Sequence, residues 1–406
     1  MTQLFGIDQS EVTALAEAVS DGDPADVFAR AAWTCLAEPG DRVAGELVAS
    51  LGAAEALTAL IGRVPASDLA ARVDADDRQT AELAQALERW MPRLQLPDVR
   101  RALTQAARFR VQLLTPAAEH WPVGIDDLGA HTPLALWVRG QLPTLAALDR
   151  SIALVGARAA TGYGEHVTME ASAGLVDRGY AIVSGAAYGI DGMAHRAALA
   201  SKGVTVAVLA GGVDRFYPSG HDALLTRIVE TGAVVSEVPC GVPPTKWRFL
   251  QRNRLIAAMS QATIVLEAGW RSGSLNTAGH ATSLGRPLGA VPGPITSAAS
   301  AGCHRLIRSY GAVCVTNADE MAELAPIDVP LFRDNQISPH HSEESRLRDT
   351  LSDRSPRTSA DLAKRSGLSL PTVQAELGRL ELEGSVVEKD RGWMLAPPPK
   401  KEKPLA

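Results

Sequence analysis

The sequence predicts an α/β protein with a Rossmann-like, doubly wound and mostly parallel sheet, an N-terminal helical module and a C-terminal winged-helix domain. Three patterns predict this fold class. Ala- and Leu-rich sequence with helical spacing comes first, short β-branched runs separated by helical stretches follow from residue 151, and two short helical segments with a hairpin pattern close the chain. Strands that are apolar on both faces are typical of parallel sheets covered by helices on both sides. The 406 residues correspond to about two to three domains.

Residues 1–110 are predicted to form a helical module of the helix-hairpin or SAM-like kind. Stretches such as ELVASLGAAEALTALIG carry apolar residues at helical spacing. The segment 64–68 and the Met91-Pro92 and Leu96-Pro97 steps divide the region into short helices, because proline interrupts a helix. We expect these helices to pack or to act as an adaptor, and direct DNA contact is the alternative.

Residues 111–325 are predicted to form the sheet domain. A connecting segment, 111–150, ends in a strand at 134–138. Seven further strands are expected at 152–156, 181–185, 204–212, 233–237, 263–268, 287–293 and 312–315. Open parallel sheets bind ligands beyond the carboxyl ends of their strands. The residues that follow these strands are therefore expected to converge on one rim.

Residues 326–342 are interpreted as a linker, 343–396 as a winged-helix domain and 397–406 as an unstructured tail. Ser359 and Ser369 are expected to cap two helices, with Pro371 in the first turn of the second, before a hairpin that turns around 390–392. The domain holds nine basic and ten acidic residues over 343–396. A protein-contact or regulatory role is favoured over duplex binding, and a transcription factor that reads duplex DNA through this domain is an alternative.

Several classes of protein are disfavoured by composition and by missing motifs. The four cysteines form no CxxC pair, so neither a zinc ribbon nor a disulfide framework is expected. No signal peptide or bilayer-length apolar run is visible, which predicts a cytoplasmic protein with no membrane span. The first glycine loop, GARAATGYG, lacks the dinucleotide spacing, and no GxxxxGK[ST] occurs. We therefore expect no cofactor and no metal.

Glycine- and serine-rich turns after the predicted strands indicate an anionic ligand. Glycine lets the backbone approach a ligand, helix N-termini attract anions, and arginine binds phosphate in a bidentate manner. The turns contain Gly156 and Arg158 after the first strand, Ser184, Gly185 and Gly189 after the second, and Arg271, Ser272, Gly273 and Ser274 after the fifth. The alternative for Ser272 and Ser274 is that their hydroxyls cap the following helix.

The charge distribution indicates that the anionic ligand is a nucleic acid. Residues 241–286 carry six Lys and Arg against one Glu, a net of +5, in a chain whose formal charge is −6. Trp247 and Phe249 lie among these cations, and aromatic side chains stack on bases that are not hidden in a duplex. The pattern favours a single strand, and a core aromatic pair with surface arginines is the alternative.

A catalytic interpretation is weaker. Ser184, Asp191 and His195 could be imagined as a triad, but Ser184 lacks the GxSxG elbow, and His195 is as well explained by packing or a hydrogen bond. The alternative function is a Rossmann-like enzyme that cleaves the N-glycosidic bond of nucleoside monophosphates, for which Glu267 alone precedes RSGSLNTA in place of a PGGxGT loop.

Seven motifs in order resemble the DNA processing protein A (DprA/Smf) family over about residues 115–320. They are VGAR (155–158), SGAAYGIDGMAH (184–195), AVLAGGVDRFYP (207–218), SEVPCG (236–241), FLQRNRLIAAMS (249–260), EAGWRSGSLNTA (267–278) and AVPGP (290–294). The resemblance implies a non-catalytic protein that binds single-stranded DNA without ATP and protects incoming DNA. It also implies loading of RecA onto DNA covered by single-strand-binding protein during natural transformation, with a homodimer as the working unit.

The resemblance further implies individual DNA-binding residues. Gly156 belongs to the VGAR block, whose Arg158 matches a phosphate-contacting arginine, and Ala157 stands where Ser is usual. The other implied positions are Ser184, Gly185 and Gly189 on a second phosphate loop, Lys202 before the third strand, and Phe249, Arg252, Asn253 and Arg254 in the F-x-x-RNR block.

Overall fold

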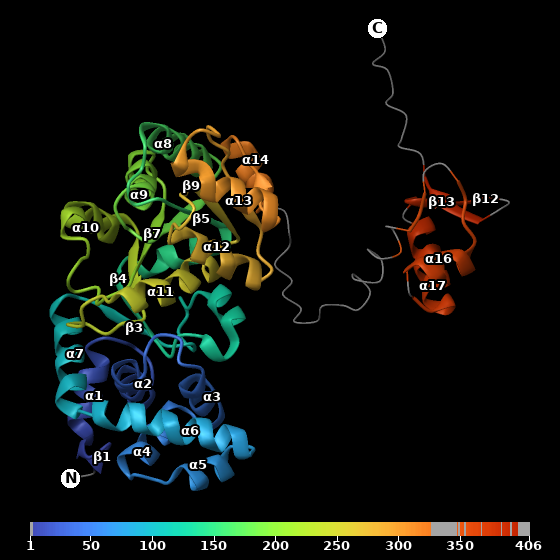
Figure 1. Cartoon of the computed structure of the whole chain (residues 1–406). Helices are drawn as coiled ribbons and strands as arrows, with labels where there is room; N and C mark the ends of the chain where they lie inside the picture. The colour runs from blue at the N-terminus through green and yellow to red at the C-terminus, as the bar shows by residue number, and fades with distance from the viewer. Residues whose placement is uncertain are drawn as a thin grey trace. The chain divides into compact units, whose positions relative to one another are not determined.

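The computed structural model describes residues 3–325 and, nearer the C-terminus, 347, 350–352, 355–366, 368–382, 384–389 and 392–396 (Figure 1). The chain divides into two units, Met1–Ile327 and Asp328–Ala406. The predicted linker, 326–342, and tail, 397–406, lie outside the described residues.

A nine-stranded sheet is the centre of the first unit, with the order β11-β10-β9-β5-β6-β7-β8-β4-β3. Its strands are β3 (Gln112–Leu114), β4 (Leu136–Gly140), β5 (Ser151–Gly156), β6 (Ala181–Ser184), β7 (Thr205–Leu209), β8 (Ala233–Ser236), β9 (Ala262–Glu267), β10 (Leu288–Ala290) and β11 (Val313–Cys314). The strands from β5 to β11 pair in parallel, whereas β4 is antiparallel to both β8 and β3. This confirms a mostly parallel sheet and adds β3, which the sequence did not predict.

Helices cover both faces of this sheet, as the two-sided apolar strands require. In β5, Ile152 and Leu154 pack towards α8 (Gly162–Asp177) and α9 (Ile190–Ala200). The alternating Ala153 and Val155 face the opposite layer. That layer contains α11 (Lys246–Ala258), α12 (Ser274–Ser283) and α13 (Ala301–Ser309). Helix α14 (Ala318–Glu323) lies beside α8. Helix α10 (Asp222–Thr231) lies over β7 and β8. The Rossmann-like, doubly wound fold class is confirmed.

The N-terminal module is helical, as predicted. It consists of α1 (Gln9–Glu17), α2 (Pro24–Leu36), α3 (Arg42–Leu51), α4 (Ala53–Ile61), α5 (Ala66–Arg72), α6 (Asp77–Trp90) and α7 (Leu96–Arg108), after the short strands β1 (Gln3–Leu4) and β2 (Ile7–Asp8). The breaks at 64–68 and at Met91-Pro92 are confirmed, whereas Pro97 lies in the first turn of α7. The module shares one core with the β3–β4 edge, where the Trp137 indole donates to Thr34 Oγ1 at 3.3 Å.

Among the described helices, none is by itself long and apolar enough to cross a membrane, and α3 and α4 meet that criterion only as a pair bent by 108°.

The second unit has the helix–helix–hairpin order expected of a winged helix. It contains α16 (Ser359–Ser366), α17 (Leu370–Leu382) and the antiparallel pair β12 (Val386–Lys389) and β13 (Gly392–Leu395) around a small apolar core. Ser369 caps α17, since its Oγ accepts from Thr372 N at 3.3 Å. The predicted cap Ser359 is wrong by one position, because Thr358 Oγ1 accepts from Asp361 N at 3.2 Å. Asp390 and Arg391, at the expected turn, lie outside the described residues.

The middle of the sheet fixes where a ligand can bind. β5 has β6 on one side and β9 on the other, so the chain winds away from β5 in opposite directions. The loops after β5 and β9 consequently diverge to opposite faces, and a crevice opens between them at the carboxyl ends of the strands. The fold therefore predicts a site between the loop that follows Gly156 and the loop that follows Glu267.

Candidate functional site

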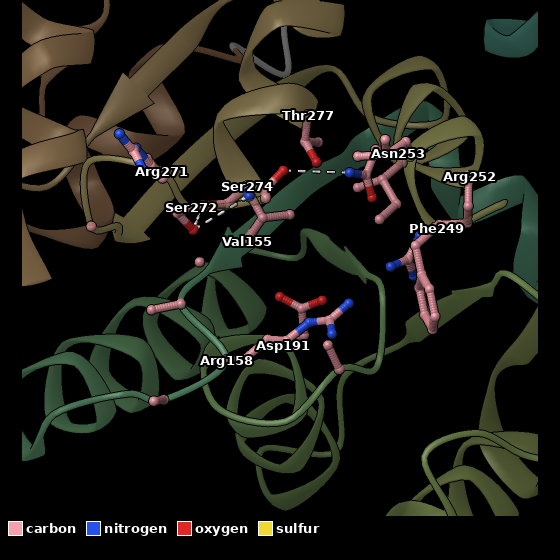
Figure 2. A pocket seen from close by; sticks show the side chains of 18 of the residues that line it. Val155, Arg158, Asp191, Phe249, Arg252, Asn253, Arg271, Ser272, Ser274 and Thr277 are labelled. Carbon is pink, nitrogen blue, oxygen red and sulfur yellow. Dashed lines mark hydrogen bonds between the residues drawn. The ribbon is translucent and has the colours of Figure 1, made fainter. Parts of the chain in front are cut away.

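A cavity of about 560 Å³ lies at this point of the sheet. Figure 2 shows side chains converging on it from the β5 loop, α9, α11 and the loop before α12. In that view Arg158 is near the middle, and Phe249 and Arg271 lie on opposite sides. The described residues that line it are Val155, Gly156, Ala157, Arg158, Ala159, Ala187, Asp191, Phe249, Leu250, Arg252, Asn253, Ile256, Gly269, Arg271, Ser272, Gly273, Ser274, Thr277 and Ala299.

The loop after β5 is held by its backbone, which leaves its arginine available. Ala157 N donates to Glu267 O at 2.7 Å, and Ile190 N donates to Ala157 O at 3.1 Å. Gly189 permits the second contact, because it has φ +76° and a Cβ there would meet the carbonyl oxygens of Ala157 and Arg158. The Arg158 side chain is exposed and has no ion pair among the described residues.

Helix α11 supplies the second wall of the cavity. Its first turn is capped by Thr245, whose Oγ1 accepts from Arg248 N at 3.3 Å. Four positions with the spacing of one helix face, i, i+3, i+4 and i+7, line the cavity: Phe249, Arg252, Asn253 and Ile256. The guanidinium carbon of Arg158 lies 5.0 Å from the centre of the Phe249 ring, and that of Arg252 lies 6.0 Å away. A cation and an aromatic face are thus presented together.

Arg252 and Asp191 form a buried electrostatic pair at the base of the cavity. Arg252 is 6 % exposed, and its Nη1 donates to Gly185 O at 2.6 Å and to Val208 O. Burial lowers the pKa of Arg252 to about 10, while the negative charge of Asp191 opposes that shift. Burial also raises the pKa of Asp191, against the charge of Arg252 and hydrogen bonds from the backbone N–H groups of Ala187, Gly156 and Gly185. The pair ties α11 to the loops after β5 and β6.

The loop before α12 forms the third wall. The Oγ atoms of Ser272 and Ser274 lie 2.8 Å apart, and Ser272 Oγ accepts from Ser274 N at 3.4 Å. Gly273 is the N-cap of α12, which has no side-chain cap hydrogen bond, so the structure does not bear out the alternative in which these hydroxyls cap the helix. Asn253 Nδ2 donates to Gly273 O at 3.5 Å and to Asn276 Oδ1 at 3.1 Å, which joins α11 to this wall.

Most of the residues implied by the sequence lie together. Eight line the cavity: Gly156, Arg158, Phe249, Arg252, Asn253, Ser272, Gly273 and Ser274. Gly185 and Gly189 lie directly behind it, since Gly185 receives the Arg252 guanidinium and Gly189 supports the β5 loop.

Three of the implied residues do not reach the cavity. Ser184 is fully buried, and its hydroxyl donates to Leu154 O at 2.6 Å, because its strand position turns the side chain into the sheet. Lys202 precedes the amino end of β7, whereas Arg158 follows the carboxyl end of the parallel strand β5. Lys202 therefore lies at the amino ends of the strands, opposite the ends that carry the cavity. Arg254 is 3 % exposed, and its Nη2 donates to Glu237 Oε2 at 2.5 Å.

The local charge excess is largely neutralised inside the protein. Arg248 donates to Glu38 through Nε and Nη2, each at 3.0 Å, and Arg254 pairs with Glu237. Arg286 pairs with Asp127 at 2.8 Å. Three of the six predicted groove cations therefore have a direct ion pair, and a fourth, Arg252, interacts electrostatically with the buried carboxylate of Asp191. The exposed Arg158 and Arg271 at the cavity have none among the described residues, so the positive field at the site is concentrated on them.

The imagined catalytic triad does not form. His195 is fully buried, and its Nδ1 lies 2.7 Å from Thr205 Oγ1, while the Ser184 hydroxyl is used by Leu154. Burial, with the nearby charges adding to it, lowers the pKa of His195 to about 3. Among the described residues, no group of three or more His, Cys, Asp and Glu side chains is arranged to hold a metal ion.

The acid expected for N-glycosidic cleavage is held elsewhere. Glu267 is 2 % exposed, and its carboxylate accepts from Thr161 N at 2.9 Å and from Thr161 Oγ1 at 2.6 Å. Its role is to anchor the start of α8, and its side chain does not line the cavity.

Two contributions to the site were missed by sequence reasoning or misread. Asp191 was considered only as a triad member, although a carboxylate one residue into a helix, after a glycine turn, is well placed to accept loop N–H groups. The apolar lining residues Leu250 and Ile256 were also missed, although Ile256 follows Phe249 by seven residues and so lies on the same helix face.

Comparison with known proteins identifies the family. A family model described as DNA recombination-mediator protein A matches residues 112–326, more than half of the chain. A putative DNA processing protein DprA of Mycobacterium tuberculosis is 46 % identical over 299 residues, which cover 70 % of this chain and 77 % of that protein. This chain belongs to the DNA recombination-mediator protein A family. The resemblance drawn from the seven motifs is thereby confirmed.

Other members of the DprA/Smf family agree in sequence and fold. Protein Smf of Escherichia coli is 37 % identical over 273 residues, covering 64 % of this chain and 71 % of that protein. The X-ray structure of DprA from Streptococcus pneumoniae matches with a TM-score of 0.58 and 27 % identity, covering 74 % of this chain and 97 % of that chain. A second family model, DprA winged helix domain, matches residues 333–390. The C-terminal unit is therefore the winged-helix domain of the family.

Proposed function

We propose that this chain binds single-stranded DNA in the cavity at the switch point of the sheet, without ATP and without a catalytic step. One observation carries the proposal: Arg158 and Arg271, two exposed arginines without an ion pair among the described residues, line the cavity together with the ring of Phe249. Guanidinium groups bind phosphate oxygens in a bidentate manner, and the ring offers a face for a base.

The shape of the site favours one strand over two. Its volume of about 560 Å³ lies within the range typical of ligand pockets, about 300–1,000 Å³, whereas a duplex presents a broad convex surface. A duplex also stacks its bases on one another, so the Phe249 ring has no base to contact. Binding through phosphates and stacking predicts little preference for sequence.

The side chains that could perform catalysis have structural hydrogen bonds instead. The Ser184 hydroxyl, the His195 imidazole and the Glu267 carboxylate are each buried and each bonded to the sheet or to the β5 loop. These contacts support a binding protein rather than an enzyme that cleaves nucleoside monophosphates.

We propose further that the bound strand is a substrate for recombination. Membership of a recombination-mediator family supports a role in which this protein protects incoming DNA and loads RecA onto DNA covered by single-strand-binding protein, in the cytoplasm, during natural transformation. A homodimer would bring two cavities into one assembly and raise the apparent affinity through effective concentration. RecA ATPase activity on coated single strands, measured with and without this protein, tests the loading step.

The experiment that tests DNA binding is a gel-shift comparison of single-stranded and duplex oligonucleotides of equal length, without nucleotide cofactor. We expect the single strand to be retained at lower protein concentration than the duplex. Equal retention of both, or release of free base from nucleoside monophosphates by the wild-type protein, would contradict the proposal.

A further inference from the structure

Trp270 is an exposed indole at the edge of the cavity. It is 59 % exposed, while Trp33, Trp90, Trp121 and Trp137 of the same unit are each at most 6 % exposed. Its two chain neighbours, Gly269 and Arg271, both line the cavity. The ring therefore adds little to the core, and it is carried on a loop whose neighbouring residues line the cavity.

The loop that carries Trp270 is fixed to α13. Gly302 N donates to Ala268 O at 2.7 Å, and a Cβ at Gly302 would meet the carbonyl oxygens of Ala268 and Gly269 at 2.7 and 2.6 Å. Ser272 N in turn donates to Gly269 O at 3.1 Å. The backbone on both sides of the indole is thus held by hydrogen bonds, so the ring is mounted on a defined turn.

Arg305 covers one face of the indole. Its guanidinium carbon lies 5.0 Å from the centre of the Trp270 ring and 5.3 Å from that of Tyr310, and its Nη2 donates to the Tyr310 hydroxyl at 2.9 Å. Because one guanidinium contacts two rings, the indole is oriented before any ligand arrives. The exposure of Trp270 shows that much of its remaining surface is open to solvent.

An oriented, half-covered aromatic ring beside a phosphate-binding arginine has the chemistry of a base-stacking platform. Each base has a π face, and stacking on an aromatic side chain tolerates any sequence. Arg271, the next residue in the chain, lines the cavity, where it can contact a phosphate, and Arg305 adds positive charge over one face of the ring. In Figure 2, Phe249 and Arg271 lie on opposite sides of the cavity, and Trp270 directly precedes Arg271 in the chain.

We propose that Trp270 is a second base-stacking position, which receives an unpaired nucleobase where the DNA strand leaves the cavity on the side opposite Phe249. This inference rests on the proposed binding of single-stranded DNA and extends it to a longer path. Arg305 acts through Trp270 as a positioning residue.

The test compares two labelled oligonucleotides of equal length, oligothymidylate and an abasic analogue with the same phosphate backbone, by fluorescence anisotropy on the full chain. We expect Trp270→Ala to weaken binding of oligothymidylate by about tenfold, in line with the loss of one stacked base. Binding of the abasic strand should change by no more than about twofold under the same rule. Trp270→Phe, which keeps an aromatic face, should recover most of the affinity.

Met169 provides a control, because it is a large apolar side chain on α8 that is 44 % exposed and does not line the cavity. Met169→Ala should leave both affinities unchanged. An equal loss on both strands with Trp270→Ala would show that the indole only shapes the loop and would overturn the inference. No loss on either strand would overturn it in favour of a protein contact. Arg158→Ala separates the two proposals, since it should weaken binding of both strands even if Trp270 has no role.

Discussion

The guanidinium carbon of Arg158 lies 5.0 Å from the centre of the Phe249 ring, although the two residues are far apart in the chain. Arg158 follows β5 and Phe249 lies on α11, so this contact exists only because the sheet places the end of β5 beside that helix. It brings a guanidinium, which we propose binds phosphate, and an aromatic ring, which we propose stacks on a base, to one point of the cavity. Changes to either partner should therefore affect the same bound nucleotide.

Arg158→Ala should weaken binding of single-stranded DNA equally for all sequences, because in the proposed function its guanidinium contacts phosphate rather than base edges. The slope of log affinity against log salt should become shallower by about 0.7, the value for one phosphate on a single strand. Binding titrations over a salt series measure both effects. Arg227→Ala, at an exposed arginine on α10 away from the cavity, is the control. A loss confined to one sequence, or an unchanged slope, would count against backbone recognition.

Gly185→Ala should weaken DNA binding and lower stability together. A Cβ at this position would meet the buried guanidinium of Arg252, which also donates to Gly185 O at 2.6 Å. Displacing Arg252 from its carbonyl partners moves the α11 wall of the cavity. The control is Gly279→Ala within α12, where nothing lies within 4 Å of a Cβ and alanine should stabilise the helix by about 1 kcal/mol. Urea denaturation and DNA titration of both variants test this prediction, which fails if Gly185→Ala retains the wild-type stability and affinity.

Arg254→Met should act mainly on stability. It would leave Glu237 buried without its ion-pair partner, at a cost of about 3–5 kcal/mol. Burial raises the pKa of Glu237 and the charge of Arg254 opposes that rise, so the substitution removes a charge that stabilises the carboxylate. The double variant Arg254→Met/Glu237→Met should recover part of the loss in urea denaturation. If single and double variants are equally destabilised, the ion pair is not the origin of the effect.

Acid should destabilise the sheet domain partly through His195. Its pKa is lowered to about 3 in the folded protein by burial, from the ordinary 6.5. The full stability is present above pH 6.5, and as pH falls the unfolded chain takes up a proton that the folded one does not. The free energy of unfolding should then fall by up to about 1.4 kcal/mol per pH unit until the pH reaches the folded pKa.

His195→Gln should remove this component, so its stability should depend less steeply on pH between 6.5 and 5 than that of the wild type. Urea denaturation at several pH values provides the measurement, with the same substitution at the exposed His166 as the control. Parallel curves for His195→Gln and the wild type would refute the assignment.

Strand positions and the rim of the sheet could be predicted because they depend on local patterns. A β-branched run followed by glycine indicates both where a strand lies and where it ends. For this reason the sequence predicts that Gly156, Arg158 and Ser272 follow strand ends on one rim, and all three line the cavity. Whether the arginines of α11 form ion pairs inside the protein could not be predicted from such local patterns. Arg248 is neutralised by Glu38, which lies 210 residues away in sequence, so a local count of charge could not detect the pair.

The orientation of individual side chains was also beyond the sequence pattern. Ser184 ends a strand, and whether its hydroxyl meets a ligand or the neighbouring strand depends on the pleat and on register, which no motif records. Lys202 shows a related limit, because a residue just before a strand and one just after it are at opposite edges of a parallel sheet.

The carboxylate of Glu38 has a practical consequence for dissecting the protein. It accepts hydrogen bonds from Arg93 in the helical module at 2.6 Å and from Arg248 on α11 at 3.0 Å, and Gly40 N donates to Glu237 at 3.0 Å. A truncation that deletes residues 1–110 would therefore remove the Glu38 carboxylate, which pairs with Arg248 on the helix that carries Phe249. A DNA-binding defect in such a fragment could arise because the α11 wall of the cavity is disturbed. Point substitutions are therefore the better way to determine the function of the N-terminal helices.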